Sequence, residues 1–598
     1  MRSSRLISGF FLAMMSCDGA APAPDAGGGC EGRAACPASE RCFAGFGCGV
    51  CEPGETDCGP DEDAPRRCGA DHRWQTLPRC ADDRVCERGR CIPGCDDDPA
   101  ARETRGCVFW ATQTLNASLG RSFEGSDRAD FPFTVVAANP WRRAVTLSVS
   151  GGGVASRELT LGARSEAQLE APWDPRLVDA GDPARRRSGV ARGAAMRLRA
   201  SHRVSAWQFN PLKFIRDPDC ERGDACFSYS NDASLLFPEN ALGRDHVVVA
   251  PPTSRVLPAQ RTAWTRAPGF IAVVGTAAGT EVTVDLRGDI EGSLDGAIPP
   301  TRAGGSVRVT LGAGDVLQLV GAHEDACADP VFDRQTESTF CRPGAGDDLT
   351  GTRVRSSAPV AVFAGHDCAL VPFDRFACDH VEEQIPPVET LGAQYVVSRA
   401  RPVQLGRSAA HPEGEPTWVR VVAAYDDTEV RVIPSDVITP ARLRAGESVS
   451  FLTARHVEVS ASRPVLVASF LVGADYLVDP SPRPLSARGD PSMSVELPLA
   501  QWRAVHDVYV PQGFSPSVLD VVGSAATRIL LDEVPVTAAG DASLPGRSVW
   551  QLAVPPGLHR VRGAGAQDVV GLRVYGYAPF TSYMARGGGD LRAIPVPQ

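Results

Sequence analysis

Lysine is almost missing from this chain of 598 residues, since Lys213 is the only one among 61 basic side chains. The net charge is −11, and no long basic run or alternation of aromatic and basic residues occurs. Proteins that bind nucleic acid need basic surfaces to contact the phosphates. The composition therefore predicts no nucleic-acid partner, and the preference for arginine is typical of a GC-rich genome.

The signature motifs of three enzyme classes are also missing. Gly-x-Ser-x-Gly and His-Glu-x-x-His do not occur, and Lys213 follows leucine rather than the glycine that a phosphate-binding loop requires. We therefore predict no catalytic residue and no cofactor.

Long apolar runs are missing beyond the N-terminus. No later segment reaches 18 uninterrupted apolar residues, so no further membrane span is expected. At the N-terminus, Arg2 and Arg5 precede the short apolar run 6–15, and residues 13–17 resemble a bacterial lipobox. This pattern predicts a signal peptide over 1–16 and a diacylglycerol anchor on Cys17; the alternative is an ordinary signal peptide cut near Ala20 or Ala21.

Cysteine, by contrast, is plentiful. Setting Cys17 aside leaves 18 of the 19 cysteines, an even number that allows nine disulfides and indicates an oxidising environment. After a flexible tether over 17–29, twelve cysteines crowd into residues 30–107, where large apolar residues are scarce. Disulfides must replace a hydrophobic core in this segment.

From residue 108 onward the sequence changes to short apolar strands in which three patterns recur. The first is a strand, a turn and a second strand, starting at residues 133, 270 and 418. The second is interpreted as a hairpin, in which Leu198, Val354 and Val459 each stand five or six residues before an apolar strand. The third, a proline followed by Leu-Gly and a Val-Val pair, closes each unit at Leu242-Gly243 and Leu391-Gly392.

These repeats, with period-two alternation, predict an all-β fold of tandem antiparallel β-sandwich-like units. The alternative is a propeller-like arrangement of the same strands. We expect β units over 108–250, 251–397, 398–510 and 511–598, after the disulfide module 30–107.

Six later cysteines lie close in sequence. We predict the pairs Cys220 with Cys226, Cys327 with Cys341, and Cys368 with Cys378, because proximity in sequence favours pairing. Each bond would order an exposed loop of the kind that often carries a binding surface.

Several blocks resemble the N-terminal domain family of IgGFc-binding proteins over about residues 106–580. The blocks are Gly106–Ala111, Ala206-Trp207-Gln208-Phe209-Asn210-Pro211, Ser230-Asn231-Asp232-Ala233-Ser234-Leu235-Leu236, and Cys378-Asp379-His380-Val381-Glu382-Glu383-Gln384-Ile385-Pro386-Pro387. The resemblance implies an extracellular setting and a binding role. It identifies no ligand-binding residue, and antibody binding is not carried over.

One group of residues invites a chemical interpretation. If Cys368 and Cys378 are bonded, His366-Asp367 and Asp379-His380 meet at one loop base, where imidazole and carboxylate can bind zinc. Alternatively, Asp379 and Glu382 make loop hydrogen bonds and the histidines cap strand ends. A structural disulfide explains both cysteines, so we predict no metal and keep His366, Asp367, Asp379 and His380 as the candidate ligands.

Together these features predict a non-catalytic lipoprotein of the bacterial cell surface that binds an extracellular protein or glycan. The alternatives are a structural component of the envelope or extracellular matrix, and a metal-dependent hydrolase that uses the histidine and acid cluster.

Overall fold

The structure is a computed structural model. It describes residues 41–43, 47–59, 63–81, 83–87, 89–95, 102–116, 119, 128–178, 187–217, 219–220, 226–259, 261–322, 326–334, 336–401, 415–477, 489–565 and 568–596. The predicted signal peptide, Cys17 and the tether lie outside these residues. The chain divides into two compact units, 1–92 and 93–598. In the described part of the chain, no helix is long and apolar enough to cross a membrane.

The first unit consists of short strands held by disulfides. Its bonds include Cys51–Cys68, Cys58–Cys86 and Cys80–Cys91. Apart from half-cystines, Ala64 and Val85 are the buried apolar side chains among its described residues. Covalent cross-links therefore take the place of an apolar core here. The strands are β1 (Arg41–Phe43), β2 (Gly47–Gly49), β3 (Thr56–Cys58), β4 (Pro65–Cys68), β5 (Trp74–Thr76), β6 (Arg84–Glu87) and β7 (Arg90–Pro93).

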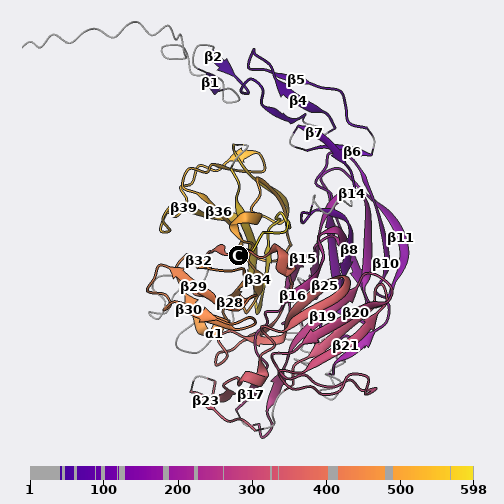
Figure 1. The fold of residues 1–598 in the computed structure, drawn as a ribbon, viewed down its shortest axis with the longest axis vertical. Coiled ribbons are helices and arrows are strands. Elements are labelled where there is room, and N and C mark those ends of the chain that lie inside the picture. Colours follow the sequence, from indigo (N-terminus) through magenta and orange to yellow (C-terminus); the bar gives the residue numbers. More distant parts are fainter. Residues whose placement is uncertain are drawn as a thin grey trace, which may run out of the picture. The chain divides into compact units, whose positions relative to one another are not determined.

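The second unit contains four groups of strands, which follow one another along the chain from purple to yellow in Figure 1. The four groups share one order of seven strand positions. Group one is β8 (Gly106–Ala111), β9 (Phe133–Ala138), β10 (Val145–Gly151), β11 (Val154–Leu161), β12 (Glu166–Ala171), β14 (Met196–Phe209) and β15 (Ala233–Leu235). Group two is β16 (Gly243–Val247), β19 (Gly269–Gly275), β20 (Thr280–Asp285), β21 (Ser306–Leu311), β22 (Val316–Val320), β25 (Arg353–Leu370) and β26 (Cys378–Gln384).

Groups three and four follow the same order, with the sixth position divided into two strands. Group three is β27 (Gln394–Val397), β28 (Thr417–Ala423), β29 (Thr428–Ile433), β30 (Ala441–Leu443), β31 (Ser448–Thr453), β32 (Val457–Ala461), β33 (Val465–Leu471) and β34 (Met493–Val495). Group four is β35 (Val505–Val510), β36 (Ser517–Ser524), β37 (Ile529–Leu531), β38 (Val534–Pro535), β39 (Arg547–Val554), β40 (Gly557–Gly563), β41 (Gly571–Ala578) and β42 (Thr581–Arg586).

The sixth strand of each group corrects the predicted hairpin. In group one, β14 does not fold back: its first half pairs with β8 and β10, and its second half pairs with β9 and β15. The strand therefore crosses from one sheet of the sandwich to the other, as β25 does in group two. The polar residues that suggested a turn mark this crossing.

A serine at the crossing in groups one, two and three explains why the polar residues recur. Ser201, Ser357 and Ser462 occupy equivalent positions, and each hydroxyl accepts a hydrogen bond from a backbone N–H of the third strand in its group. The donors are Thr146, Glu281 and Glu429, at distances of 2.9–3.0 Å. The hydroxyl replaces a ladder partner that the bend of the strand removes.

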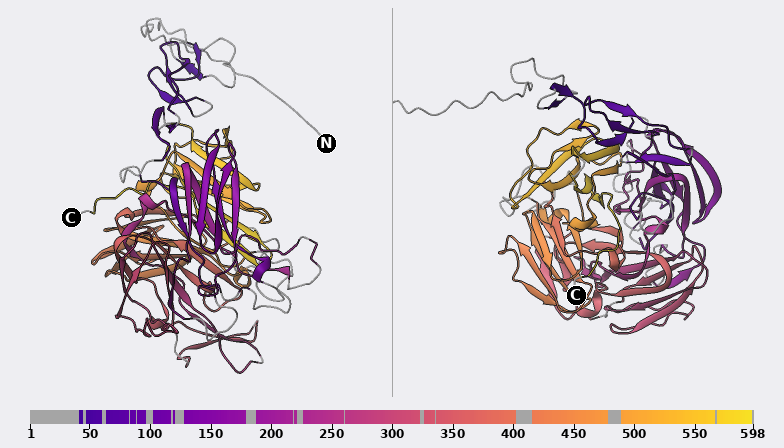
Figure 2. Two further views of the ribbon diagram at one scale, coloured as in Figure 1. Left: turned by 90° about the vertical axis from the view of Figure 1, so that its right-hand side faces the viewer. Right: turned by 45° about the horizontal axis from the view of Figure 1, so that its top comes forward.

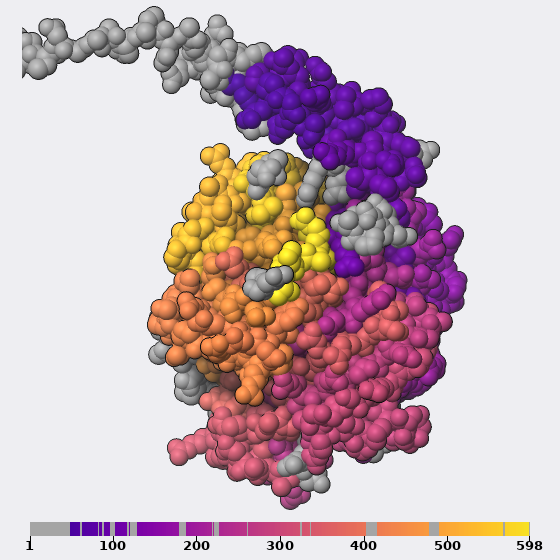
Figure 3. Space-filling model, in the orientation of Figure 1, coloured from indigo at the N-terminus to yellow at the C-terminus, as the bar shows by residue number. Residues whose placement is uncertain are grey.

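The innermost strands of the four groups close a ring. β15 contacts β26 and β42, and β34 contacts β26 and β42. Figure 2 shows the four groups around this centre, and Figure 3 shows groups three and four, in orange and yellow, as neighbouring sectors of one face. Groups three and four are sandwiches, because in each of them side chains from two four-stranded sheets share one apolar cluster. The predicted all-β fold with antiparallel sheets and a disulfide-rich N-terminal region is confirmed.

A glycine–proline contact recurs at the start of three groups. A Cβ on Gly106, Gly243 or Gly392 would lie 2.2–2.5 Å from the Cβ of Pro238, Pro387 or Pro498, respectively. Each proline follows the last strand of the same group and precedes a 3-10 helix, η5 (Glu239–Ala241), η7 (Val388–Thr390) or η8 (Leu499–Gln501). The Leu-Gly pattern, which the sequence suggests as the end of a unit, thus leads into the first strand of the next group.

The strand pairings place the boundaries between groups at other residues than the sequence predicts. β16 pairs with β25, β27 with β32, and β35 with β40, so each of these strands belongs with the strands that follow it. Likewise, Cys95 and Cys107 bond to each other within the second unit.

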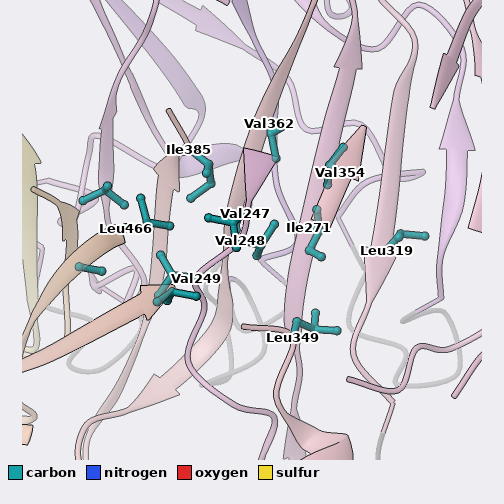
Figure 4. Close-up of a cluster of buried hydrophobic side chains, with 14 of the residues drawn as sticks. Val247, Val248, Val249, Ile271, Leu319, Leu349, Val354, Val362, Ile385 and Leu466 are labelled. Atoms are coloured by element: carbon teal, nitrogen blue, oxygen red, sulfur yellow. The ribbon is translucent and has the colours of Figure 1, made fainter. Parts of the chain in front are cut away.

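A large apolar cluster fills group two and extends into group three. Its residues are fully buried valine, isoleucine and leucine side chains from several strands, including Val247, Ile271, Val354, Val362 and Leu466 (Figure 4). This packing holds the inner strand β26 in place, because Val381 and Ile385 belong to the same cluster.

Group two carries an additional four-stranded sheet. Its order is β18-β17-β24-β23, and Cys327–Cys341 links the segment before β23 to β24. Phe340 of this sheet packs on Phe376, with ring centroids 5.1 Å apart. The bounds are β17 (Ser254–Leu257), β18 (Thr265–Ala267), β23 (Pro330–Asp333) and β24 (Ser338–Cys341). We call these four strands the insert sheet.

Candidate functional site

The centre of the ring is polar, and one carboxylate there connects all four groups. Asp232, just before β15, accepts hydrogen bonds at Oδ1 from Ser492 Oγ (2.5 Å) and the N–H of Met584 (3.1 Å). Its Oδ2 accepts from the N–H groups of Glu382 (3.0 Å) and Met493 (3.1 Å). Burial raises the pKa of Asp232, whereas these hydrogen bonds favour the ionised form. The four groups therefore meet on a single side chain.

Asp379 of β26 makes a second connection through the centre. Its Oδ2 accepts a hydrogen bond from Thr581 Oγ1 of group four at 2.6 Å, and its Oδ1 accepts from the N–H of Asn231 of group one at 2.9 Å. Burial, followed by the nearby charge of Asp490, raises the pKa of Asp379. Groups one, two and four are thus joined at this point.

Glu382 points into group one. Gln208 Nε2 lies 3.1 and 3.0 Å from the two carboxyl oxygens, and Thr114 Oγ1 donates to Oε2 at 3.0 Å. Burial raises the pKa of Glu382 to about 8. At neutral pH this carboxyl group is therefore largely protonated, and it acts as a neutral hydrogen-bonding group.

The next residue, Glu383, pairs with Arg586 of group four at 2.6 Å, and both side chains are fully buried. The Arg586 guanidinium also lies over the ring of Phe237, 4.8 Å from its centroid. Burial raises the pKa of Glu383 to about 7 even though the arginine beside it lowers it. Such an isolated buried pair contributes mainly by fixing which strands meet.

The two histidines of the predicted cluster lie close together in the interior. Burial lowers the pKa of His380 to about 3; Asp367 counteracts this and His366 adds to it. His380 stacks on Phe270 at 5.7 Å and places Nε2 3.3 Å from Thr114 Oγ1. This histidine is therefore neutral and forms part of the packed centre.

His366 is held by its own strand, β25. Its Nδ1 accepts the N–H of Cys368 at 3.0 Å, and burial lowers its pKa to about 4. The structure pairs Cys368 with Cys378, and also Cys220 with Cys226 and Cys327 with Cys341, the same partners that sequence proximity predicts.

The candidate metal ligands do not share one coordination site. His366, Asp367, Asp379 and His380 are all fully buried. The Asp379 carboxylate, however, is hydrogen-bonded to Thr581 and Asn231. Within the described ranges, no group of three or more His, Cys, Asp and Glu side chains could hold a metal ion. Asp379 and Glu382 make hydrogen bonds from within β26, and His366 and His380 lie inside β25 and β26 and do not cap strand ends.

The blocks that carry the family resemblance supply most of this centre. Gln208, Asp232, Asp379 and Glu382 all come from them, although their neighbours in space are up to 352 residues apart in sequence. Their partners Thr114, Ser492, Thr581 and Arg586 do not stand out in the sequence. Two of these partners, Ser492 and Thr581, stand at the start of an innermost strand, as Asp232 does. An alignment of the three segments would have identified both residues from the sequence.

The four connections from the sixth strand to the innermost strand lie at one end of the ring, and we call them the connection end. Phe580 of group four packs against Phe227 and Tyr229 of group one, with centroids 5.4 and 5.3 Å apart. The Asp475 N–H of group three donates to the carbonyl of Phe376 of group two at 2.8 Å. The connections are residues 210–232, 371–377, 472–492 and 579–580, as far as the structure describes them.

The aromatic residues of the connection end are unusual in two respects. Phe227, Tyr229, Phe376 and Phe580 are only half-buried. Tyr229 and Phe580 also have φ angles of 53° and 64°, in the left-handed region that bulky residues rarely adopt. Backbone strain of this kind collects at binding and catalytic sites. The strained backbone and the two nearby disulfides make the connection end the candidate binding surface.

At the opposite end, the last residues of the chain close the ring. Thr104 donates its N–H to the carbonyl of Gly589 at 3.0 Å. The adjacent Glu103 carboxylate is surrounded by the guanidinium groups of Arg105, Arg203 and Arg503, all buried. Although burial raises the pKa of Glu103, these three arginines together lower it to about 2. Groups one and four are thus linked by a charged cluster.

A small cavity lies between groups three and four. It measures about 20 Å³, and Ser398, Glu496, Asp520 and Arg573 are among the residues that line it. This space suits one water molecule bridging polar groups, and it is far smaller than a substrate site.

Comparison with known proteins supports a family assignment. Residues 232–576 match the family described as IgGFc binding protein. The human IgGFc-binding protein is 32% identical over 166 residues, which is 28% of this chain and 2% of the human protein. A crystal structure of a putative membrane anchored protein from Corynebacterium diphtheriae aligns with 77% of this chain and 98% of its own, at 9% identity and a TM-score of 0.08, too low to bear on the fold.

The family match begins at Asp232, the residue on which the four groups meet, and it includes the block around Glu382. It covers more than half of the sequence. The chain belongs to the IgGFc binding protein family.

Proposed function

We propose that this protein is a non-catalytic binding module for an extracellular protein or glycan, displayed on the bacterial cell surface by a lipid on Cys17. Family membership and the printed name of the human relative support a binding role. The density of disulfides supports export, and the lipobox-like residues 13–17 support the anchor. Acidic net charge gives no support to a nucleic-acid partner.

The connection end is the observation that carries this proposal. Its half-buried aromatic side chains offer apolar area on a backbone that disulfides and inter-group hydrogen bonds keep ordered. An ordered surface loses little conformational entropy when a partner binds, and aromatic anchors supply most of the affinity in such interfaces. The buried centre behind it provides the rigid support.

Binding is tested with the full exported chain and defined probes. The probes are a glycan array and purified immunoglobulin Fc, measured by biolayer interferometry. We expect saturable binding to one probe that falls at least tenfold in Phe227→Ala and Phe580→Ala. Val534→Ala, at a side chain 65% exposed in β38, is the matched control and keeps full affinity.

Two results would contradict the proposal. Saturable binding that is equal in all three variants would remove the connection end as the binding surface. The absence of saturable binding to any probe would favour the alternative of a structural envelope or matrix component. The lipid is tested separately by intact-mass analysis of the exported protein, which should show cleavage before Cys17 and the mass of an acylated cysteine.

A further inference from the structure

The insert sheet ends in a strand with an open edge. β23 is the last strand in the order β18-β17-β24-β23, and among the described residues no further strand pairs with it. Groups one, three and four have no counterpart of this sheet in their described parts, so it is an addition to the ring and not an element that closes it. Its own disulfide, Cys327–Cys341, and the Phe340–Phe376 contact hold it in place.

The pairing register shows which backbone groups face outward. The N–H of Arg342 donates to the carbonyl of Asp329 at 3.0 Å, just before β23, and the register pairs Val331 with Phe340. In an antiparallel ladder, every second residue turns its N–H and C=O away from the partner strand. Counting from Asp329, these residues are Pro330 and Phe332. Pro330 has no N–H, so the edge offers the N–H and C=O of Phe332 and the C=O of Pro330.

The same residue carries an exposed apolar side chain. Phe332 is 60% exposed, whereas Phe340 of the adjacent strand is fully buried. An exposed phenylalanine beside free backbone donors and acceptors combines the two features of strand addition, in which main-chain hydrogen bonds give affinity and side chains give selectivity.

We propose that β23 is a docking edge at which an extended segment of the protein partner adds a fifth strand to the insert sheet, with Phe332 as the apolar anchor. This inference rests on the proposed binding function and names the kind of partner. A second copy of the chain is the weaker candidate, because edge pairing over four residues buries far less than the roughly 1,200 Å² of a stable interface. An extended segment of a protein partner can bury further area, because it can make contacts beyond the four residues of the edge.

The test uses a displayed library of random twelve-residue peptides, selected on the full chain. Three variants dissect the edge: Phe332→Leu keeps the N–H and an apolar side chain, Phe332→Pro removes the N–H, and Phe332→Asp removes the apolar anchor. Leu294→Asp, at a side chain 77% exposed outside the insert sheet, is the control. Melting temperature and hydrogen exchange report whether each variant is folded.

We expect enriched peptides to bind wild type, Phe332→Leu and Leu294→Asp equally. They should bind at least tenfold more weakly to Phe332→Pro and Phe332→Asp, and should slow exchange of the Phe332 amide. Peptides that bind all variants alike, selection without enrichment, protection of that amide in the free monomer, or a doubling of mass that Phe332→Pro abolishes would overturn the inference.

The outcome is separable from that of the proposed function. If Fc or glycan binding is saturable but unaffected by Phe332→Pro, the binding function stands and the docking edge fails. If peptides pair with β23 while neither probe binds, the edge stands and the proposed function fails.

Discussion

At the scale of single residues, the polar groups in the centre of the ring do what a hydrophobic core cannot. Burial of apolar area is non-directional, whereas the four hydrogen bonds to Asp232 form only when Glu382, Met493 and Met584 stand at one register. Removing one partner of such a set leaves buried groups unsatisfied. The carboxyl groups therefore specify how the four groups meet, at an electrostatic cost that shows in their pKa values.

Glu382 provides a pH test of this view. Its pKa in the unfolded chain is near 4.5 and burial raises it to about 8 in the folded state. Its contribution to stability is therefore greatest below pH 4.5 and is lost as the pH rises towards 8. We expect the free energy of unfolding to fall between pH 5 and pH 8 by up to about 4 kcal/mol more in wild type than in Glu382→Gln, as measured by urea unfolding.

The matched control is Glu281→Gln on the exposed face of β20, which should leave the pH dependence of wild type unchanged. His380 and His366 are present in every variant, so their own effect at acid pH cancels in the comparison. Parallel pH profiles for wild type and Glu382→Gln would show that this carboxyl group is not buried as described.

At the scale of elements, the sequence could predict strands but not all of their partners. Alternation and recurrence locate most strands, because one-sided burial imposes a period of two. The predicted hairpin is wrong, because the segments on the two sides of Ser201, Ser357 and Ser462 pair with other strands and not with each other. A polar interruption of a strand has the same composition as a hairpin loop. Pairing between sheets depends on contacts distant in sequence, which composition does not encode.

The candidate site could be predicted only in part, for the same reason. His366, Asp379, His380 and Glu382 are conspicuous because they crowd around two cysteines. Arg586 stands alone in a degenerate copy of the repeat and becomes significant only when β42 is placed beside β26. The sequence alone also leaves open the partners of Asp379, whose carboxylate accepts hydrogen bonds from Thr581 and Asn231 in other groups.

The recurring glycine–proline contact gives a prediction for an element boundary. Alanine at Gly243 would place a Cβ 2.2 Å from the Cβ of Pro387, so β16 and η7 must separate. We expect Gly243→Ala to lower the free energy of unfolding by about 1–3 kcal/mol, the usual cost of overpacking. Differential scanning calorimetry measures the change.

Gly189 in β13 (Gly189–Ala191) is the matched control, because a Cβ at this position would meet nothing within 4 Å and its φ lies outside the left-handed region. Gly189→Ala should be neutral or slightly stabilising. Equal melting temperatures for the two variants would mean that the contact between glycine and proline does not constrain the fold.

At the scale of the whole second unit, closure joins chain segments almost 500 residues apart. The Thr104–Gly589 hydrogen bond and the cluster around Glu103 attach the last residues to the first strand of group one. Within the described part of the second unit, each group of strands therefore has a neighbouring group on both sides.

Neutralising Glu103 should open this closure. Glu103→Gln removes the carboxylate that Arg105, Arg203 and Arg503 share, although Arg105 keeps Asp507 and Arg503 keeps Asp590 as partners. Loss of one buried carboxylate from such a set costs about 3–5 kcal/mol at pH 7. Because the folded-state pKa is about 2, wild type should lose the same contribution as the pH falls from about 4.5 towards 2. Urea midpoints at pH 7 and pH 3 check both statements.

Asp436→Asn serves as the control, since Asp436 forms an exposed pair with Arg455 at 3.0 Å. Such exposed pairs contribute little to stability, because solvent screens them. If Glu103→Gln were no more destabilising than Asp436→Asn at pH 7, the cluster could not be what closes the ring.

The central claim is that one buried carboxylate locks four groups of strands into a single cooperative body. Hydrogen exchange of the backbone amides of Glu382, Met493 and Met584, which all donate to Asp232, tests it most directly. The account predicts that these three amides exchange together, at the rate of global unfolding, and that Asp232→Asn accelerates all three equally. Three different rates in wild type, or acceleration of one amide alone in Asp232→Asn, would contradict it.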